Sequence, residues 1–216
     1  MSPGTLSVER DCAVRRFVLP TGSPRRIVLA LQAALVVVLL AGLALRNTSV
    51  VVNATFSLAV TLLPALLARD FGVHFDPWLV LWITLAALLH SLGMVGVYES
   101  VWWWDHLTHA FSAALVTAIG YAIVVAVDRH SETVHLPRAF LWLFVFLLTV
   151  AVGVVWETME FLTRELARVA GMRPVLIVYG VEDTILDLVF DCVGALLAAV
   201  LLHLGGGRSL VDRLRA

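Results

Sequence analysis

Seven side chains in this sequence have the types and the spacing that metal or acid–base chemistry needs: Asp105, His109, Glu157, Glu160, Asp183, Asp187 and Asp191. The first two are four residues apart, the next two are three apart, and the last three recur at every fourth position. Each set therefore shares one face of a helix. Carboxylate oxygens combined with an imidazole nitrogen suit zinc, manganese, iron or magnesium. We expect a site for a divalent metal ion, whose identity the sequence leaves open.

The elements that carry these side chains are too apolar for a water-soluble protein. Of the 216 residues, 61% are hydrophobic and 14% are charged, whereas a soluble domain has about 25% charged residues. Six runs with few or no charges are long enough to cross a hydrocarbon core of about 30 Å as helices. These runs are residues 27–45, 47–68, 77–98, 106–127, 139–156 and about 184–204. The sequence predicts an all-α integral membrane protein, a bundle of six transmembrane helices.

The chain is expected to form one membrane domain with short ends. Residues 1–26 would be an N-terminal tail, residues 27–204 the six-helix domain, and residues 205–216 a C-terminal tail. The first tail has no short apolar core, so we expect a retained first span in place of a cleaved signal. The longest connection is expected at about residues 163–182, too short for a separate soluble domain. The two cysteines, in the first tail and the last span, do not indicate a disulfide framework.

Arginine distribution predicts the orientation. All 15 basic residues are arginine, and the absence of lysine excludes Schiff-base chemistry. If both termini are cytoplasmic, eleven arginines lie on that side and four on the other, which the positive-inside rule favours. We expect a multi-pass protein of the plasma membrane with N- and C-termini in the cytoplasm. The net charge of −1 gives no reason to expect a nucleic-acid partner; the expected partner is the lipid bilayer, and the oligomeric state is left open.

The alternation of spans brings the acidic sets together at the outer face. The fourth span starts, the fifth ends and the sixth starts on the same side of the membrane. About 13 residues, or roughly 20 Å of helix, separate Asp191 from the glycines that end the last span, which places this carboxylate about 10 Å inside the core. Carboxylates at that depth are costly and mark functional or tightly paired sites. Because these spans contain no arginine at that depth, a divalent cation or shared protons must offset the negative charge.

Some of these polar residues also have simpler interpretations. Asp105 and Asp183 stand where they could cap the fourth and sixth helices. The tryptophans at 102–104 fit an interfacial aromatic belt. His90, two turns inside the third span, is expected to be a hydrogen-bonded core histidine that at most supports the site.

The segments DHLTHAF, WETMEF and DTILDLVFDCVGALLA resemble those of VanZ-like membrane proteins, and they are more similar to the YjdF-like relatives of that group. The resemblance covers about residues 84–200. It implies a polytopic membrane architecture and a site made from Asp105, His109, Glu157, Glu160, Asp183, Asp187, Asp191 and Gly194. Glu160 and Asp191 stand where the VanZ pattern has an amide and an asparagine. Both departures add negative charge, which favours a metal.

Three functions remain compatible with a polar, metal-binding pocket formed by these residues. The first is a metal-dependent hydrolase or transferase acting on a lipid headgroup, with Glu160 and Asp187 as catalytic residues. Arg164 and Arg168 would hold an anionic headgroup through bidentate hydrogen bonds, although they could simply pair with Glu165 or with lipid phosphates. The alternatives are a proton- or cation-coupled transporter and a non-catalytic membrane protein with a structural metal site. Whether the protein is an enzyme is left open.

Overall fold

The computed structural model describes residues 23–72, 75–131, 133, 136–176 and 179–204, and in these ranges every regular element is a helix. The elements are α1 (Ser23–Ala44), α2 (Thr48–Phe71), α3 (Pro77–Leu92), the π-helical segment η2 (Gly93–Val97), α4 (Tyr98–Ser100), α5 (Trp104–His130), α6 (Arg138–Ala170) and α7 (Val181–Leu204). Six helices are long and apolar enough to cross a membrane, the third formed by α3, η2 and α4 together. The all-α, six-span expectation is confirmed.

Local sequence signals explain several helix ends. Asn47 precedes α2, and its side chain accepts a hydrogen bond from the backbone N–H of Val50. Gly72 ends the same helix with a φ of 67°, the left-handed conformation that glycine adopts at low cost. Asp76 caps α3 by accepting a hydrogen bond from the backbone N–H of Trp78, and proline follows it at the first helical position.

Helix α6 is longer than the apolar run that predicts it. It has 33 residues, a length of about 50 Å against a core of about 30 Å. The apolar run 139–156 is therefore continued by fourteen more helical residues, 157–170, which carry the charged sequence around Arg164. The expected connection at residues 163–182 is wrong in its length, because the helix stops only at Gly171, which has a φ of 65°.

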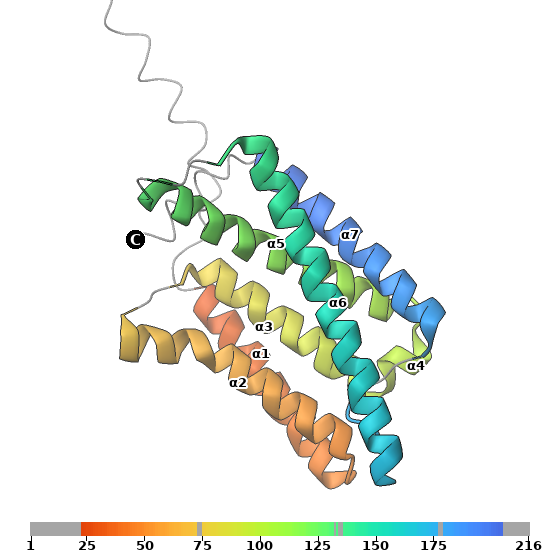
Figure 1. Cartoon of the computed structure of the whole chain (residues 1–216). Coiled ribbons are helices and arrows are strands. Elements are labelled where there is room, and N and C mark those ends of the chain that lie inside the picture. Colours follow the sequence, from red (N-terminus) through yellow and green to blue (C-terminus); the bar gives the residue numbers. More distant parts are fainter. Residues whose placement is uncertain (1–22, 73–74, 132, 134–135, 177–178, 205–216) are drawn as a thin grey trace, which may run out of the picture.

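The helices form two groups of three (Figure 1). Helices α1, α2 and α3 pack on one another, as do α5, α6 and α7, and contacts between α3 and α5 join the groups. One buried cluster lies between α5 and α6 and includes Val125 and Val145. Another includes Val50 and Met94 in the first group. Large apolar side chains are exposed along every long helix, as expected for a surface that contacts lipid.

Two glycines allow α7 to lie unusually close to its neighbours. A Cβ atom on Gly194 would overlap the backbone carbonyl of Ala110 in α5, and a Cβ atom on Gly153 in α6 would overlap a carboxylate oxygen of Asp191. Both glycines are buried. The close approach of α5, α6 and α7 thus depends on the absence of side chains at these positions. It brings the polar faces of the three helices within reach of one another.

The third span is irregular at the end near the polar faces of α5, α6 and α7. Within η2, Gly96 has a φ of 121°, which interrupts the helix. Gly93 lies against the ring of Tyr98, where a Cβ atom would collide with the ring carbons. These two glycines let the chain turn so that Tyr98 folds back toward α3. The sequence predicted a single uninterrupted span at residues 77–98 and did not anticipate this break.

Candidate functional site

His109 of α5 lies at the centre of four carboxylates that come from three helices. Its Nε2 atom is 3.7 Å from Glu157 Oε1, 3.9 Å from Asp105 Oδ1 and 3.9 Å from Asp187 Oδ2. Its Nδ1 atom is 3.2 Å from Asp191 Oδ1. The start of α5, the middle of α6 and the first half of α7 therefore meet. The three spans come together as their alternation predicted, but the expected end of the fifth span lies inside α6, because this helix continues to Ala170.

The two ring nitrogens of His109 have different surroundings. A carboxylate accepts hydrogen bonds and does not donate them, so Nδ1 carries the proton in its bond to Asp191. In the neutral imidazole this leaves the lone pair of Nε2 directed toward the oxygens of Asp105, Glu157 and Asp187. An imidazole that is held by a carboxylate at one nitrogen and free at the other is the usual arrangement of a metal-ligating histidine.

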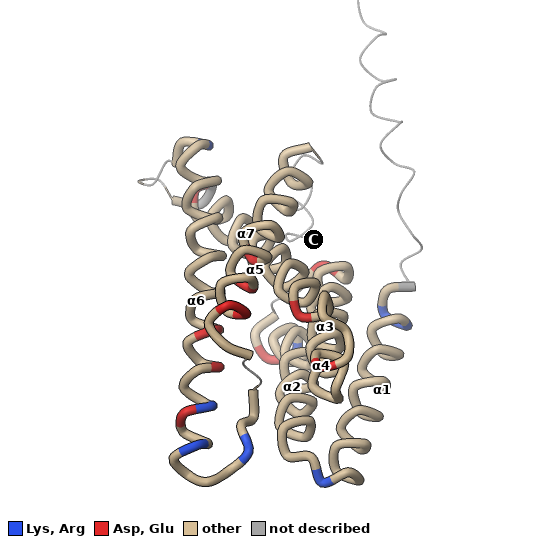
Figure 2. Tube along the Cα trace, turned by 90° about the vertical axis from the view of Figure 1, so that its right-hand side faces the viewer, with Lys and Arg blue, Asp and Glu red and all other residues tan. Residues whose placement is uncertain are grey.

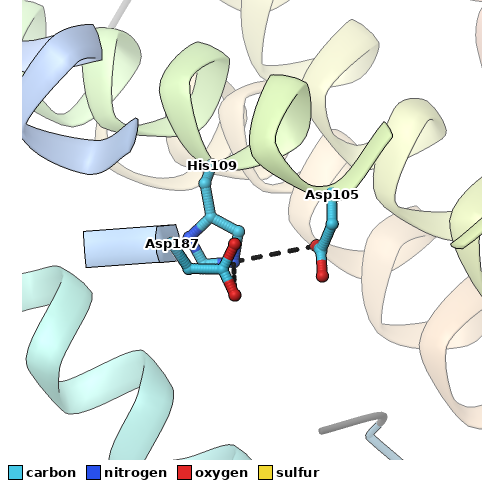
Figure 3. A group of neighbouring side chains, drawn as sticks. All are labelled: Asp105, His109 and Asp187. Carbon is cyan, nitrogen blue, oxygen red and sulfur yellow. Dashed lines mark ion pairs between the residues drawn. The ribbon is translucent and has the colours of Figure 1, made fainter. Parts of the chain in front are cut away.

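Three of these residues offer atoms that are close enough to share one ion: Asp105, His109 and Asp187, whose ligand atoms all lie within 4.8 Å of one another (Figure 3). Ligands about 2.1 Å from a tetrahedral ion are about 3.4 Å apart, so a small contraction would suffice. Asp187 is 1% exposed and Glu157 is 7% exposed. Asp105 is half-buried and Asp187 is buried, so the group lies between helices and is not a surface acidic patch.

His106 is part of the same cluster, and the sequence reasoning did not assign it to the site. Its Nδ1 atom is 3.3 Å from Asp187 Oδ1, while the other oxygen of Asp187 faces His109. The imidazole ring stacks on Phe190 of α7, with centroids 4.6 Å apart and planes 3° apart. These contacts hold the Asp187 carboxylate through the oxygen that does not face His109. The spacing of three residues between the two histidines is the signal that could have identified His106.

Two buried carboxylate oxygens in the cluster have no hydrogen-bond partner among the described residues, Glu157 Oε1 and Asp191 Oδ2. Burying such atoms without a partner is costly. The described arginines that form ion pairs, Arg69, Arg164 and Arg168, pair only with Asp70 and Glu165. In the described part of the chain, histidine is thus the only basic residue type that approaches these carboxylates. The donor set fits a divalent cation both in its chemistry and in its unsatisfied oxygens.

Glu160 and the cluster open into a cavity of about 280 Å³. Glu160 is buried and lines this cavity together with Asp105, His109 and Asp191. Most of the remaining lining is apolar and comes from α2, α3, α5 and α6. Glu160 takes part in no ion pair among the described residues, and its carboxylate lines the cavity beside Trp156.

His90 belongs to a hydrogen-bond network beside the site. The Asn53 amide donates to the carbonyls of Ser49 and Val175, which leaves its oxygen to accept from His90 Nε2 at 3.1 Å. His90 Nδ1 then accepts from the Tyr98 hydroxyl at 3.0 Å. His90 is a hydrogen-bonded core histidine, as expected. The contribution of α2 through Asn53 was missed, since an isolated amide in an apolar run carries no spacing signal.

The acidic residues at the starts of α5 and α7 differ in their contacts. No side chain caps α5, so Asp105 does not have the capping role that was weighed for it. Asp183 Oδ2 accepts a hydrogen bond from the backbone N–H of Tyr179, just before α7, and Asp183 is not in the group of atoms close enough to share an ion.

Trp102 and Trp103 are exposed, while Trp104 donates from its indole to the carbonyl of Leu89.

The arginines near the end of α6 lie outside the cavity. Arg168 donates to Glu165 at 2.9 Å, and Arg164 Nε is 3.8 Å from the same carboxylate and over the ring of Phe161. The simpler pairing with Glu165 is thus present. Figure 2 shows several basic segments at this end of α6 and in the loop after it, with acidic segments further along α6. Arg173 in that loop is exposed.

Electrostatic effects of the acidic residues reach the loop before α7, which lies outside the spans. Burial raises the pKa of the Tyr179 phenol to about 12, and the carboxylates of Glu99, Asp105 and Asp183 act in the same direction. Negative charge next to a phenol opposes the loss of its proton. These three carboxylates thus place negative charge near the loop before α7, and such charge attracts cations.

Comparisons with known proteins found a matching family model and a related sequence. A family model described as "Predicted membrane protein (DUF2238)" matches residues 26–206. An "Uncharacterized protein" of Thermotoga maritima is 30% identical over 125 residues, 57% of this chain and 60% of that protein. The chain thus matches less than two thirds of that relative's length. No solved structure matches the sequence. The family match extends over the first two spans, beyond the residues 84–200 that carry the VanZ-like and YjdF-like resemblance.

Proposed function

The chain belongs to the DUF2238 family of membrane proteins, and we propose that it is a metal-dependent membrane enzyme, a hydrolase or transferase that acts on a lipid headgroup with a divalent cation held between α5, α6 and α7. We also propose that the chain is related to the YjdF-like or VanZ-like proteins. YjdF is itself a DUF2238 family. The site would open to the outer face of the plasma membrane.

One observation carries the proposal: His109 Nε2 points at three carboxylates from three helices, while a fourth carboxylate holds Nδ1. Protonation of His109 alone would add one positive charge against four carboxylates. A divalent cation between Nε2 and the oxygens of Asp105, Glu157 and Asp187 supplies two charges and gives the partnerless Glu157 oxygen a ligand bond. Asp191 would then orient the imidazole, a supporting role in place of the ligand role expected from sequence.

The remaining residues have distinct tasks in this proposal. When bound, the cation would act as a Lewis acid toward a phosphoryl or carbonyl oxygen and would make a water molecule more acidic. Asp187 would hold the cation, and His106, 3.3 Å from one of its oxygens, would fix its carboxylate. Glu160 faces the cavity without an ion-pair partner and would accept a proton from the attacking group. Asp183 stays a candidate outer ligand at the start of α7.

Metal analysis of purified protein tests the proposal. Wild-type protein loaded in turn with zinc, manganese, iron and magnesium should retain about one ion per chain for at least one of them, the stoichiometry of one such ligand set. The variant with both His109→Ala and Asp187→Asn should retain none. Glu182→Gln is the matched control, because Glu182 is an exposed carboxylate in the first turn of α7. Wild-type protein that retains none of the four ions would overturn the proposal.

The Glu160→Gln variant separates an enzyme from a protein with a structural metal. In the proposed enzyme this substitution leaves metal content unchanged and lowers the hydrolysis of phosphate amphiphiles by roughly 10²–10⁴-fold, the contribution of general acid–base catalysis. Phosphate release from a panel of long-chain phosphate esters is the measurement. A metal-loaded wild-type protein that hydrolyses no ester in the panel favours the structural alternative.

A transporter is the second candidate, because the third span is interrupted near the site. Gly96 has a φ of 121° within η2, and interrupted helices often line ion sites in transporters. Proteoliposomes distinguish the two functions. A transporter would move protons or the bound cation across the vesicle membrane, whereas the proposed enzyme would not.

Arg164 and Arg168 are proposed to meet the anionic headgroup outside the cavity. Both are on the extension of α6, and they share Glu165 as a partner. A phosphate in place of this carboxylate would offer more acceptor oxygens for the bidentate hydrogen bonds that guanidinium groups favour. The Arg164→Ala and Arg168→Ala variants should bind vesicles containing anionic lipid more weakly at unchanged metal content. Loss of metal or of folding in these variants would make the arginines part of a structural charge network.

A further inference from the structure

The cavity beside the metal-binding cluster has two chemically different ends. At one end are the polar side chains of His109, Glu160 and Asp191. The rest of the lining is mostly apolar, with Val60 of α2 and Ile83 of α3 among its residues and a few hydroxyl side chains such as Thr149. A molecule that fills this space must combine a polar head with a hydrocarbon part.

Two residues that line the cavity are also exposed on the membrane-spanning surface. Phe56 of α2 and Val152 of α6 both line it, and they are 64% and 42% exposed. Both residues lie within spans, so their exposed faces would contact lipid and not water. A hydrocarbon chain can therefore enter between α2 and α6 directly from the bilayer without crossing water.

The size of the cavity suits one chain. Its volume of about 280 Å³ is at the lower limit of small-molecule pockets, which span about 300–1,000 Å³. A chain that moves from lipid into an apolar cavity exchanges one apolar environment for another, so it gains little free energy from the transfer. Affinity and selectivity must come from the polar end, where the carboxylates would repel an anionic head unless a cation is bound.

We propose that this cavity binds a single-chain phosphate amphiphile, with the chain against α2, α3 and α5 and the phosphate oxygens at the cation of the cluster. This inference rests on the proposed function and names its substrate class. Phosphate oxygens are hard ligands that suit the cations this donor set favours. Entry from the bilayer places the phosphate beside Glu160 and the chain in the apolar part.

Photolabelling tests this inference. The probe is a long-chain alkyl phosphate that carries a diazirine near the end of its chain, applied to metal-loaded protein in detergent. Peptide mapping should locate the label at cavity residues such as Val60 and Ile83, and excess unlabelled alkyl phosphate should remove it. The corresponding alkyl alcohol, which lacks the phosphate, should label these residues at least about tenfold less, because it lacks the head that the cation binds.

Filling the cavity supplies the matched comparison. Ala87→Phe adds a ring to the wall on α3, whereas Ala151→Phe adds the same ring at an exposed position on α6. The first variant should lose cavity labelling and keep its metal, and the second should keep both. If Ala87→Phe fails to fold, Val116→Phe provides the same test from α5.

The outcomes separate this inference from the proposed function. Metal-loaded wild-type protein whose label lies only on outward-facing positions such as Leu197, or whose cavity label survives both cavity-filling substitutions, overturns the amphiphile site and leaves the metal site standing. Labelling of the cavity by phosphate and alcohol probes alike, in protein that retains no metal, overturns the phosphate recognition together with the proposed function.

Discussion

At the scale of single residues, the cluster is organised by pairs in which one side chain fixes another. Asp191 holds Nδ1 of His109 at 3.2 Å, and His106 holds one oxygen of Asp187 at 3.3 Å while Phe190 supports the His106 ring. The atoms left free by these pairs, Nε2 of His109 and Oδ2 of Asp187, face one another across 3.9 Å. Such supporting contacts determine how well the metal-ligating side chains are oriented before a metal ion binds.

His106→Ala therefore tests a supporting role against a ligand role. Loss of a supporting partner typically lowers metal affinity by about 10–100-fold, and we expect this effect because Asp187 loses the contact that orients it. His109→Ala, which removes a ligand, should abolish binding in the same titration. Competition with a chelator of known affinity measures both. Equal loss in the two variants would mean that His106 is itself a ligand.

The residue types and spacing predicted much of this cluster, but not the division of roles within it. Spacing of three and four residues placed Asp105 with His109 and Glu157 with Glu160 on common helix faces, and the structure brings these faces together. Spacing could not tell that Asp191 meets Nδ1 and not Nε2 of His109, because this depends on the rotation of α7 against α5. That rotation is set by packing contacts such as Gly194 on Ala110.

At the scale of elements, the site depends on how closely α7 approaches α5. A Cβ atom on Gly194 would overlap backbone atoms of Ala110, which cannot move without moving the helix. Gly120, also in α5, provides a contrast, because a Cβ atom there would come within 3.1 Å of only the end of the Leu148 side chain. Flexible side-chain ends can adjust, whereas a helix backbone cannot.

Gly194→Ala should consequently destabilise the protein by about 1–3 kcal/mol, the usual cost of overpacking. Gly120→Ala should be neutral or slightly stabilising, since alanine is favoured over glycine inside a helix by roughly 1 kcal/mol. Thermal unfolding of the purified variants in detergent compares the two directly. Equal melting temperatures would show that α5 and α7 do not need to approach as closely as the structure places them.

Helix positions were predicted well where they depend on hydrophobic length and poorly where they depend on charged or glycine-rich sequence. All six apolar runs are helices. The extension of α6 to Ala170 was underestimated as a connection, because charged residues such as Arg164 and Glu165 do not register as a span although they form a good helix. The break at Gly93–Val97 was hidden in an apolar run, because glycine permits a break without requiring one.

At the scale of the whole molecule, two groups of three helices enclose a cavity between them. The sequence identified the polar group α5–α7 but assigned little to the first two spans. It could not show that α2 and α3 form the apolar wall of the cavity, because contacts between distant spans follow from packing and not from local pattern. The hydrogen bonds from Ser49 and Asn53 to Val175 also join these groups and carry no signal in the sequence.

Membrane orientation remains a prediction at this scale. The arginine bias predicts that residues 1–26 and 205–216 are cytoplasmic tails, most of which lie outside the described residues, and that the cluster faces outward. A reporter fused after Ala216 should be cytoplasmic, and Cys12 should react with a membrane-impermeant thiol reagent only after the cells are opened. The half-buried Cys192 lies within α7, and Cys12→Ser controls for it. Labelling of Cys12 from outside intact cells would contradict the predicted orientation.

The central claim is that a divalent cation binds between α5, α6 and α7. The most direct measurement is an experimental structure of the metal-loaded protein with anomalous scattering recorded at the absorption edge of the metal. We expect one anomalous peak about 2.0–2.6 Å from His109 Nε2 and from oxygens of Asp105, Glu157 and Asp187. A crystal of protein supplied with the metal would contradict the claim if these side chains hydrogen-bond to one another and no anomalous peak lies among them.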